Sequence, residues 1–303
     1  MNRAEIPLLQ ELIAKYQLSE PDYQEILLDI IRDTTYKKAT SSKPTVVILG
    51  AQPGAGKTEL QKEAELQLNR NAVICNADNF RDYHPLASEI KKDYPGFYPD
   101  ITVQLAQRWN DSLVKHCLDN KFDFILETTF SSRSRLNQTI HSFKEAGYQV
   151  DIMLLAVNPK LSLLGTYLRY EHSVANFGTG RHVSQISHDI RFESIPKTIT
   201  SIVQTPLFDN ISLYARRMAA DEHGATEGVI CVAINPPNIF SAYQAEIDRS
   251  WSEEMTVYFQ KKVDEVLSLM AKRNAQQEEV AHFKEALGLE RSQRQGKRRK
   301  LGL

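Results

Sequence analysis

The residues with the clearest chemical capacity lie in the segment GAQPGAGKTEL, residues 50–60. They satisfy the pattern G-x-x-x-x-G-K-[ST] at every fixed position but the first, where Ala51 stands instead of glycine and Gly50 comes one position early. Glycines in such a loop let backbone N–H groups turn toward phosphate oxygens, and the positive end of the following helix adds to the attraction. A glycine-rich turn that only packs a helix against a strand is the alternative, but the Gly-Lys-Thr sequence favours a phosphate-binding loop.

We therefore expect a nucleotide site in this segment. Lys57 would reach the β- and γ-phosphates, and Thr58 would offer its hydroxyl to Mg²⁺. The residues expected to contact the nucleotide are Gly50, Ala51, Gln52, Pro53, Gly54, Ala55, Gly56, Lys57 and Thr58.

A second group of candidates lies in AVICNADNFRDYHP, residues 72–85. Asp78 is expected where a strand ends, at the carboxyl edge of the sheet, and a carboxylate there could accept the proton of an attacking hydroxyl. Arg81 and His84 follow at distances from which they could bind a substrate or the same carboxylate. The residues alone leave open whether Asp78 is a catalytic base or a helix N-cap, which is a common role for Asp after a strand.

A third candidate, Glu127, ends the apolar run in FDFILETTF. A carboxylate in this position could hold Mg²⁺ through water, as the second acidic group of many P-loop enzymes does. The alternative is an acid that caps a turn.

Two arginines bracket a glycine-containing segment further along the chain. Arg169 lies in GTYLRYE and Arg181 in FGTGRHVS. Such a pair would suit a lid that closes over phosphate and neutralises charge in the transition state. Taken without the P-loop, each arginine would more simply belong to a solvated helix face or a salt bridge.

Short apolar runs alternate with helical patterns from residue 45 onward. This alternation predicts an α/β fold, with a P-loop NTPase-like parallel sheet flanked by helices. The runs that we expect to form strands are 45–50, 72–78, 122–127, 148–157, 211–216 and 228–234.

Helical extensions are expected at both ends of this region. Apolar residues at helical spacing predict two amphipathic helices within residues 4–33, broken near Pro21, and a helical segment over residues 240–287. The expected segments are a helical segment with linker at 1–43, the P-loop kinase domain at 44–235, a helical extension at 236–290 and a basic disordered tail at 291–303. The tail could contact a polyanion, serve as an import-like basic cluster or only increase solubility.

The composition limits the class of protein. The chain has 303 residues, 42% hydrophobic and 25% charged, with a net charge of −1. The near-neutral charge gives no overall attraction to nucleic acid or to anionic membranes, so neither partner is expected. The first residues lack the apolar stretch of a secretory signal, and no run approaches the roughly 18 apolar residues of a membrane span. The three cysteines are expected to be small core residues, as in a cytoplasmic protein.

The ordered series of motifs resembles the zeta toxins of bacterial toxin–antitoxin systems. The matching segments lie within residues 44–215 and are GAQPGAGKTEL, NADNFRDYHP, ILETTF, LLGTYLRYE and GRHVSQISHD. The resemblance implies a phosphotransferase that uses ATP and Mg²⁺ to phosphorylate the 3′-hydroxyl of the amino sugar of UDP-N-acetylglucosamine. The product of that reaction blocks cell-wall synthesis, so the resemblance implies a UDP-sugar as substrate.

The resemblance also implies roles on the donor side of the site. Lys57 matches the phosphate position, and Thr58 matches the metal position. Asp78 matches the catalytic base, while Arg169 and Arg181 match the two nucleotide-side arginines.

On the acceptor side the match is less complete. Glu127 and Thr129 match a substrate-binding Glu-x-Thr, and Asp111 aligns with a glutamate that contacts the sugar but is one methylene shorter. Thr128 replaces a small residue, and Ser131 stands where some members carry a substrate arginine. These departures leave the kinase interpretation intact and concern the identity of the acceptor.

Some zeta-like chains resemble a toxin fused to its own inhibitor, so the N-terminal helices could screen the nucleotide cleft. A structural cap, or a surface that docks a separate antitoxin, is the alternative. Two other functions also fit the motifs. One is a kinase of another small metabolite or nucleotide, and the other is a non-catalytic nucleotide-binding module. The second would need the phosphate-binding loop but not Asp78.

Overall fold

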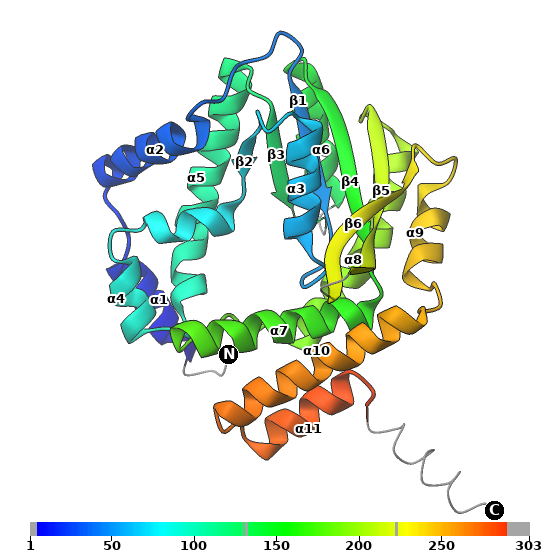
Figure 1. The fold of residues 1–303 in the computed structure, drawn as a ribbon. Helices are drawn as coiled ribbons and strands as arrows, with labels where there is room; N and C mark the ends of the chain where they lie inside the picture. Colours follow the sequence, from blue (N-terminus) through cyan, green and yellow to red (C-terminus); the bar gives the residue numbers. More distant parts are fainter. Residues whose placement is uncertain (1–4, 129, 131–132, 222–223, 290–303) are drawn as a thin grey trace, which may run out of the picture.

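The computed structural model describes residues 5–128, 130, 133–221 and 224–289. Its centre is a six-stranded sheet in the order β2-β3-β1-β4-β5-β6 (Figure 1). The first five strands are parallel and β6 pairs antiparallel with β5. The strands are β1 (Thr45–Gly50), β2 (Val73–Cys75), β3 (Phe124–Thr128), β4 (Gln149–Ala156), β5 (Asn210–Asp221) and β6 (Gly224–Ile234).

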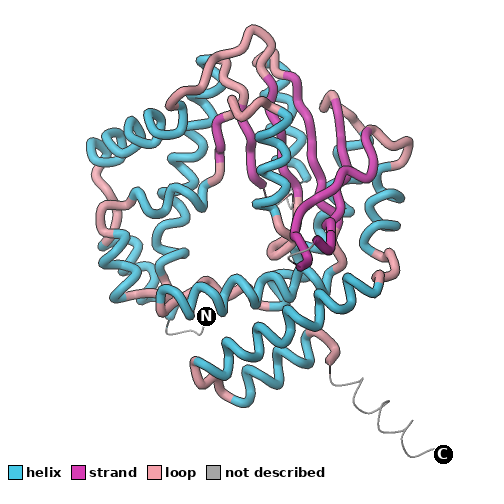
Figure 2. Tube along the Cα trace, viewed as in Figure 1, coloured by secondary structure: helices cyan, strands magenta, loops and turns pink. Residues whose placement is uncertain are grey.

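Helices cover both faces of this sheet (Figure 2). They are α1 (Glu5–Lys15), α2 (Glu20–Thr35), α3 (Lys57–Gln67), α4 (Ala87–Asp93), α5 (Tyr98–Asn120), α6 (Arg133–Glu145), α7 (Pro159–Phe177), α8 (Gln185–Gln204), α9 (Ile239–Ile247), α10 (Glu253–Lys272) and α11 (Gln277–Ala286), with a 3₁₀-helix η1 (Ala77–Tyr83). One large apolar cluster joins the sheet to α2, α5, α6, α8 and α9, and a second joins it to α3, α7, α10 and α11. This arrangement confirms the predicted fold class.

The central strand explains where the site forms. Val46 to Leu49 are buried, as expected for a parallel strand covered on both faces. Leu49 pairs in register with Glu127 of β3, and Gly50 pairs with Leu154 of β4. The loop after β1 therefore begins beside the end of β3, at the carboxyl edge of the sheet, where parallel α/β sheets bind ligands.

Two strand expectations were wrong in detail. The strand expected over residues 72–78 ends at Cys75, and Asp78 lies instead in the first turn of η1. Asn76 is the N-cap of η1, because its side-chain oxygen accepts a hydrogen bond from the Asp78 N–H (3.0 Å). The strand therefore gives way to η1 at this residue. The last two strands form an antiparallel hairpin, so the sheet is not wholly parallel.

The C-terminal extension forms three helices, α9 to α11, rather than one. Of the apolar residues that we expected to form a buried stripe there, namely Val257, Val263, Val266, Leu267 and Met270, Val263, Val266 and Met270 are buried, but Val257 is exposed. Figure 1 shows α10 and α11 stacked beneath α7. The basic tail at 291–303 lies outside the described residues.

The N-terminal helices pack on the body of the protein through aromatic side chains. Tyr23 of α2 stacks on Trp109 of α5, with ring centroids 5.9 Å apart. Leu12 of α1 and Tyr16 just after it share an apolar cluster with residues of α4 and α5, among them Ile90. These contacts fit a structural cap on the side of the sheet that carries η1.

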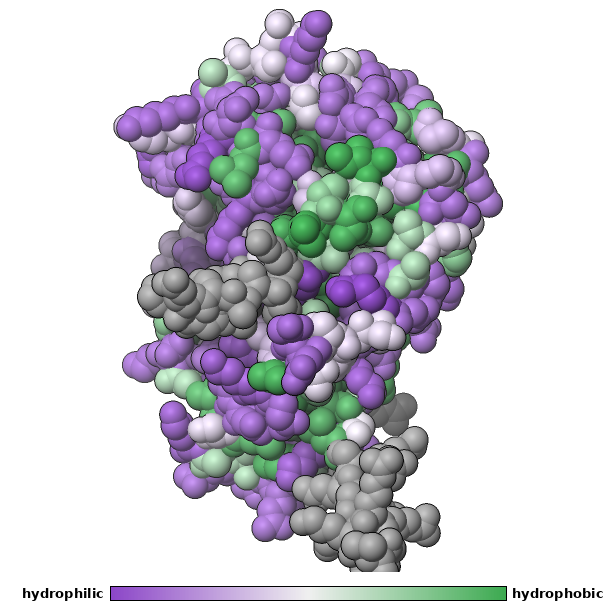
Figure 3. All heavy atoms as spheres, turned by 45° about the vertical axis from the view of Figure 1, so that its right-hand side comes forward, coloured by the Kyte–Doolittle hydropathy of each residue, from purple (hydrophilic) through white to green (hydrophobic). Residues whose placement is uncertain are grey.

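The outer strand β6 has an apolar exposed surface. Ile230, Val232 and Ile234 are all exposed, and Figure 3, which brings this side forward, shows hydrophobic side chains gathered on it. Cys231 on the same strand is exposed as well, which corrects the expectation that all three cysteines belong to the core. In the described part of the chain, no helix is both long enough and apolar enough to cross a membrane.

Candidate active site

The loop between β1 and α3 has the backbone of a phosphate cradle. Gly54 and Gly56 have φ angles of +74° and +98°, which glycine adopts without strain. Gly54 also packs against the backbone of α7, where a Cβ would overlap the Ser162 carbonyl oxygen. A Cβ on Gly165 of α7 would likewise overlap the Gly54 carbonyl oxygen, so both positions need glycine for this contact. Ala51, the residue in place of the first glycine, is fully buried.

Lys57, the first residue of α3, points toward an acidic partner at the end of β3. Its Nζ lies 3.5 Å from Glu127 Oε1, and both side chains are about one-fifth exposed, at 19% and 20%. The other oxygen, Glu127 Oε2, accepts a hydrogen bond from Asn76 Nδ2 at 2.8 Å. Burial lowers the pKa of Lys57, while Glu127 and Asp78 oppose that shift. The Glu127 carboxylate therefore counteracts the loss of charge that burial favours at Lys57.

Asp78 is held by an arginine of its own helix. Arg81 donates to Asp78 Oδ1 from Nε (2.9 Å) and from Nη2 (2.7 Å). Arg81 is itself buried and anchored, because its Nη1 donates to the Pro99 carbonyl and to Thr102 Oγ1 of α5. Asp78 keeps 53% of its side chain exposed. It is therefore a fixed carboxylate with access to a ligand.

Two further cations converge on Asp78. Arg181 Nη1 lies 3.5 Å from Asp78 Oδ1. Burial raises the pKa of Asp78, but Arg81, Arg181 and Arg169 more than offset that effect and lower it overall. Burial and the Arg181 charge lower the pKa of Arg169, and Asp78 and Glu127 oppose them. Lys57, Glu127, Asp78, Arg169 and Arg181 therefore form one electrostatic cluster beside the loop.

The comparison with known families covers the segments that carry this cluster. Residues 29–224, about two-thirds of the chain, match the model of the family described as Zeta toxin. The chain belongs to the Zeta toxin family. The matched range contains the P-loop, η1, the end of β3 and both arginines, and it confirms the resemblance drawn from the sequence motifs.

Curated relatives support the assignment. The chain is 27% identical over 199 residues to Toxin PezT of Streptococcus pneumoniae serotype 4, an alignment that covers 65% of this chain and 79% of PezT. It is also 27% identical over 195 residues to Toxin zeta of Enterococcus hirae, with 64% of this chain and 68% of the relative covered. Both relatives are named as toxins, in agreement with the family model.

Solved structures show the same fold. The structure from the PezAT chromosomal toxin–antitoxin system of Streptococcus pneumoniae superposes with a TM-score of 0.72 at 24% identity, covering 83% of this chain and 98% of that one. The AvrRxo1-ORF1:-ORF2 structure with ATP superposes more distantly, with a TM-score of 0.51 at 15% identity over 77% and 75% of the two chains.

Not every residue predicted for the substrate side joins the cluster. His84 is buried, its Nδ1 accepts from the Leu86 N–H (3.1 Å), and its Nε2 lies 2.9 Å from the Tyr16 carbonyl oxygen. It therefore ties α1 to η1, because both ring nitrogens are used for structure. Arg81, expected to bind substrate, is committed to Asp78 in the same way.

Asp111 lies on α5 with an exposed side chain, and it accepts a hydrogen bond from Gln107 (2.8 Å) one turn earlier. Thr58 is exposed in the first turn of α3, beside the cradle. Thr129 and Ser131 lie outside the described residues. The structure therefore brings the donor-side predictions together more fully than the acceptor-side ones.

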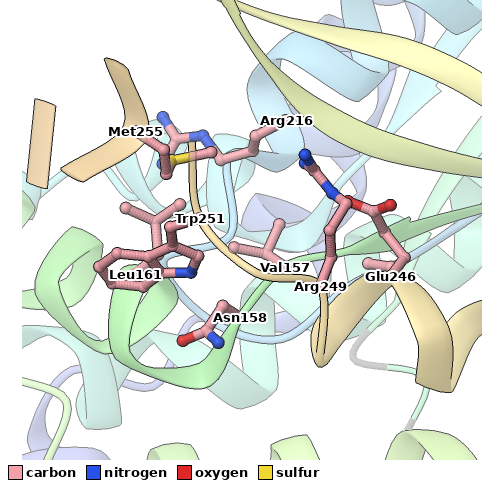
Figure 4. Close-up of a pocket in the computed structure, with 9 residues that line it drawn as sticks. Val157, Asn158, Leu161, Arg216, Glu246, Arg249, Trp251 and Met255 are labelled. Carbon is pink, nitrogen blue, oxygen red and sulfur yellow. The ribbon is translucent and has the colours of Figure 1, made fainter. Parts of the chain in front are cut away.

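Sequence reasoning missed a cleft beside the P-loop. It lies beside the end of β4 and the middle of β5, against the start of α10, with a cavity volume of about 20 Å³ (Figure 4). Arg216 of β5 connects it to the cradle, because its guanidinium lies 3.8 Å from the position of a Cβ on Gly56. Trp251, Met255 and Arg249 come from the C-terminal extension, beyond the family match. Only Trp251, a large aromatic residue in a polar segment, offered a sequence signal.

Proposed function

We propose that this protein transfers the γ-phosphoryl group of ATP to a hydroxyl of a UDP-sugar, with the 3′-hydroxyl of UDP-N-acetylglucosamine as the first candidate. The observation that carries the proposal is the convergence of one accessible carboxylate, Asp78, with Lys57, Arg169 and Arg181 at the mouth of a P-loop. A binding module needs the cradle but has no use for a fixed carboxylate directed toward the phosphate end.

In the proposed reaction, the acceptor hydroxyl oxygen attacks the γ-phosphorus as the bond to the ADP oxygen breaks. Asp78 orients the hydroxyl and accepts its proton, which then passes to solvent. Lys57 and the two arginines stabilise the charge that spreads over the transferred group. The protein contributes position and electrostatics, which supply most of the acceleration in phosphoryl transfer.

Magnesium would enter this site with the nucleotide. Thr58 offers a hydroxyl and Glu127 a carboxylate, and such oxygen ligands suit Mg²⁺, which keeps several waters and uses substrate phosphates as further ligands. Among the residues that the structure describes, no group of three His, Cys, Asp or Glu side chains could hold a metal without the nucleotide. A bound Mg²⁺ would neutralise charge on the β- and γ-phosphates.

We propose that the base of the nucleotide lies over the open side of the cleft beside Arg216, because the enclosed space of about 20 Å³ is too small to hold it. That cleft adjoins the N-terminal end of α3, where the phosphates are expected, and Trp251 gives it an aromatic wall (Figure 4). Aromatic and apolar walls with a few polar groups are typical of ligand pockets.

On the acceptor side, we propose that Glu127 and Asp111 contact the UDP-sugar. Glu127 is positioned by Asn76 and Lys57, and Asp111 is free to turn from Gln107 because it is exposed on α5. A kinase of another small metabolite or nucleotide is the alternative, since Asp111, Thr128 and Ser131 are where the chain departs from the family pattern.

We also propose that the protein acts as a toxin restrained by a separate antitoxin, as PezT belongs to a toxin–antitoxin system. The packing of α1 and α2 on α5 and η1 favours a structural cap over inhibition in cis. The chain would then work in the cytoplasm, where both ATP and UDP-sugars are available.

Incubation of the full chain with Mg-ATP and a panel of UDP-sugars and nucleosides, followed by mass spectrometry, tests this proposal. We expect an added phosphate on one UDP-sugar, and none with Lys57→Met. Lys62→Met is the matched control, because Lys62 is an exposed lysine of the same helix that pairs only locally with Glu59. Phosphorylation of a nucleoside or of another metabolite alone would replace the proposed acceptor.

A further inference from the structure

A buried chain of hydrogen bonds connects the P-loop to α7 and α8. Gln52, Ser162 and His188 are all 0% exposed. Gln52 Nε2 donates to the Val157 carbonyl (2.8 Å) and lies 3.3 Å from Ser162 Oγ. Ser162 Oγ lies 2.8 Å from His188 Nε2, and His188 Nδ1 lies 2.8 Å from Asp189 Oδ1. None of these side chains has a role in the proposed phosphoryl transfer.

The partners determine how the protons are arranged along this chain. A carboxylate can only accept, so in the neutral imidazole His188 Nδ1–H donates to Asp189 and Nε2 is left as an acceptor. Ser162 then donates its hydroxyl proton to His188 Nε2 and accepts from Gln52. The Ser162 hydroxyl also lies 3.1 Å from the Pro159 carbonyl, a second acceptor that the shorter His188 contact outcompetes. His188 therefore determines which atom donates in each hydrogen bond from Gln52 through Ser162.

The hydrogen bonds join the P-loop, α7 and α8, and each of these three elements carries or directly adjoins one of the cations expected to bind phosphate. The loop of Gln52 leads into Lys57, and α7 carries both Ser162 and Arg169. Helix α8, which carries His188, begins right after the loop that contains Arg181. The three cations thus sit on separate segments, and these hydrogen bonds join those segments inside the protein.

The close backbone packing of Gly54 on Gly165 gives the P-loop a second attachment to α7. Gly54 and Gln52 lie two positions apart, so the loop is held at both points. The Gly54 contact limits how closely the loop and α7 approach each other, but it does not orient the loop. A buried hydrogen bond requires a defined geometry, and removing one partner leaves the other unsatisfied at a cost in free energy.

We infer that His188 is a positioning residue: through Ser162 and Gln52 it holds the P-loop in its nucleotide-binding form and sets Lys57, Arg169 and Arg181 in register. This inference rests on the proposed function only in taking the P-loop as a nucleotide site. It does not depend on the identity of the acceptor.

Two substitutions at His188 separate its hydrogen bond to Ser162 from its hydrogen bond to Asp189. His188→Gln can place an acceptor where Nε2 lies and so keeps the Ser162 contact, whereas His188→Asn keeps a donor near Asp189 and loses Ser162. We expect His188→Asn to weaken Mg-ADP binding about tenfold, the effect of one buried hydrogen bond, and His188→Gln to stay within about threefold of the wild type. Isothermal titration calorimetry on the full chain measures both. Equal losses in the two variants would overturn the inference.

A control and a double-mutant cycle distinguish positioning from simple core packing. Thr198→Val removes another buried hydroxyl of α8, bonded to the Ser194 carbonyl (3.0 Å), and should lower the unfolding temperature without changing Mg-ADP affinity. Gln52→Ala combined with His188→Asn should bind no more weakly than the weaker single variant, because both act through one chain. Losses that multiply in the double variant would contradict the inference.

If the wild type binds no Mg-ADP, the proposed function fails, and the same cycle is then read on the unfolding temperature. Shifts for Gln52→Ala and His188→Asn that are smaller together than their sum would still support the chain of hydrogen bonds. Additive shifts would overturn it.

Discussion

Arg81 binds Asp78 through two hydrogen bonds, from Nε at 2.9 Å and from Nη2 at 2.7 Å, and both reach the same oxygen, Oδ1. The Arg181 contact at 3.5 Å falls on Oδ1 as well. The carboxylate is thus fixed through one oxygen, and Oδ2 is the atom that the geometry offers to an acceptor hydroxyl. In the proposed mechanism Oδ1 holds the Asp78 carboxylate in place, and Oδ2 accepts the proton of the acceptor hydroxyl.

Replacing Asp78 with Asn keeps the shape of the side chain and a carbonyl oxygen for Arg81, but it removes the proton acceptor. We expect phosphoryl transfer to fall about 10³-fold while ATP binding stays within a few fold, because the cradle is unchanged. Single-turnover rates and calorimetric binding measure the two effects. Loss of ATP binding would instead give Asp78 a structural role.

The charge on Asp78 should persist into mild acid. Burial raises the pKa of Asp78, but the Arg81 hydrogen bonds and three arginine charges bring it below the ordinary 3.8. A carboxyl group is ionised above its pKa, so a lowered pKa keeps Asp78 ionised down to a lower pH. The charge is lost only as the pH falls through the lowered value. We therefore expect no loss of kcat/KM attributable to Asp78 between about pH 8 and about pH 5.

Arg81→Met should move the acid limb of that profile upward, since it removes the hydrogen bonds that lower the pKa of Asp78. Arg108→Met is the control, because Arg108 pairs with Glu20 on the outer side of α5 and both side chains are exposed. An unchanged acid limb in Arg81→Met would show that Arg81 does not set the charge of Asp78.

The sequence alone predicted the parts of the site that depend on local pattern. The run before Gly50 gave β1, the glycines gave the cradle, and Glu127 was placed at the end of β3 as observed. These predictions succeed because a buried parallel strand and a P-loop are both encoded within a few consecutive residues.

The remainder depends on contacts between distant segments, which no local pattern encodes. His84 has the spacing of a ligand to Asp78, yet its Nε2 meets the Tyr16 carbonyl at the end of α1 and its Nδ1 accepts from the Leu86 N–H. Arg216 and Trp251 line one cleft because the chain brings β5 and the segment before α10 together beside the end of β4. Val257 faces solvent because it lies on the side of α10 opposite Val266, whereas α7 and α11 cover the side that carries Val266.

A buried ion pair outside the site should govern stability. Arg273, which follows α10, donates to both oxygens of Glu171 on α7 at 2.8 and 2.9 Å, and the Glu171 side chain is 1% exposed. Arg273→Met should lower the free energy of unfolding by about 3 kcal/mol, because it leaves a buried carboxylate unpaired. Urea denaturation measures this change.

Lys115→Met is the matched control for that experiment. Lys115 pairs with Asp119 at 2.6 Å on the exposed face of α5, and such surface pairs contribute about 0.5 kcal/mol or less. Similar losses in the two variants would show that the Arg273 pair does not hold α10 to α7.

Trp251 should report nucleotide binding if the base occupies the cleft next to Arg216. Of the two tryptophans, Trp109 is fully buried against Tyr23, so a change in fluorescence on adding Mg-ADP would come from Trp251. We expect a saturable change that disappears in Trp251→Phe, while calorimetry still detects binding. A signal that survives in Trp251→Phe would place the base elsewhere.

Transfer of a labelled phosphoryl group tests the central claim most directly. ATP carrying ¹⁸O at the non-bridging oxygens of its γ-phosphate is incubated with Mg²⁺, UDP-N-acetylglucosamine and the full chain, and the products are resolved by mass spectrometry. We predict a UDP-sugar that has gained one phosphoryl group with all of its label, formed by the wild type and by Lys62→Met but not by Asp78→Asn. Bound ATP with no labelled UDP-sugar, or label that appears only in inorganic phosphate, would contradict the assignment.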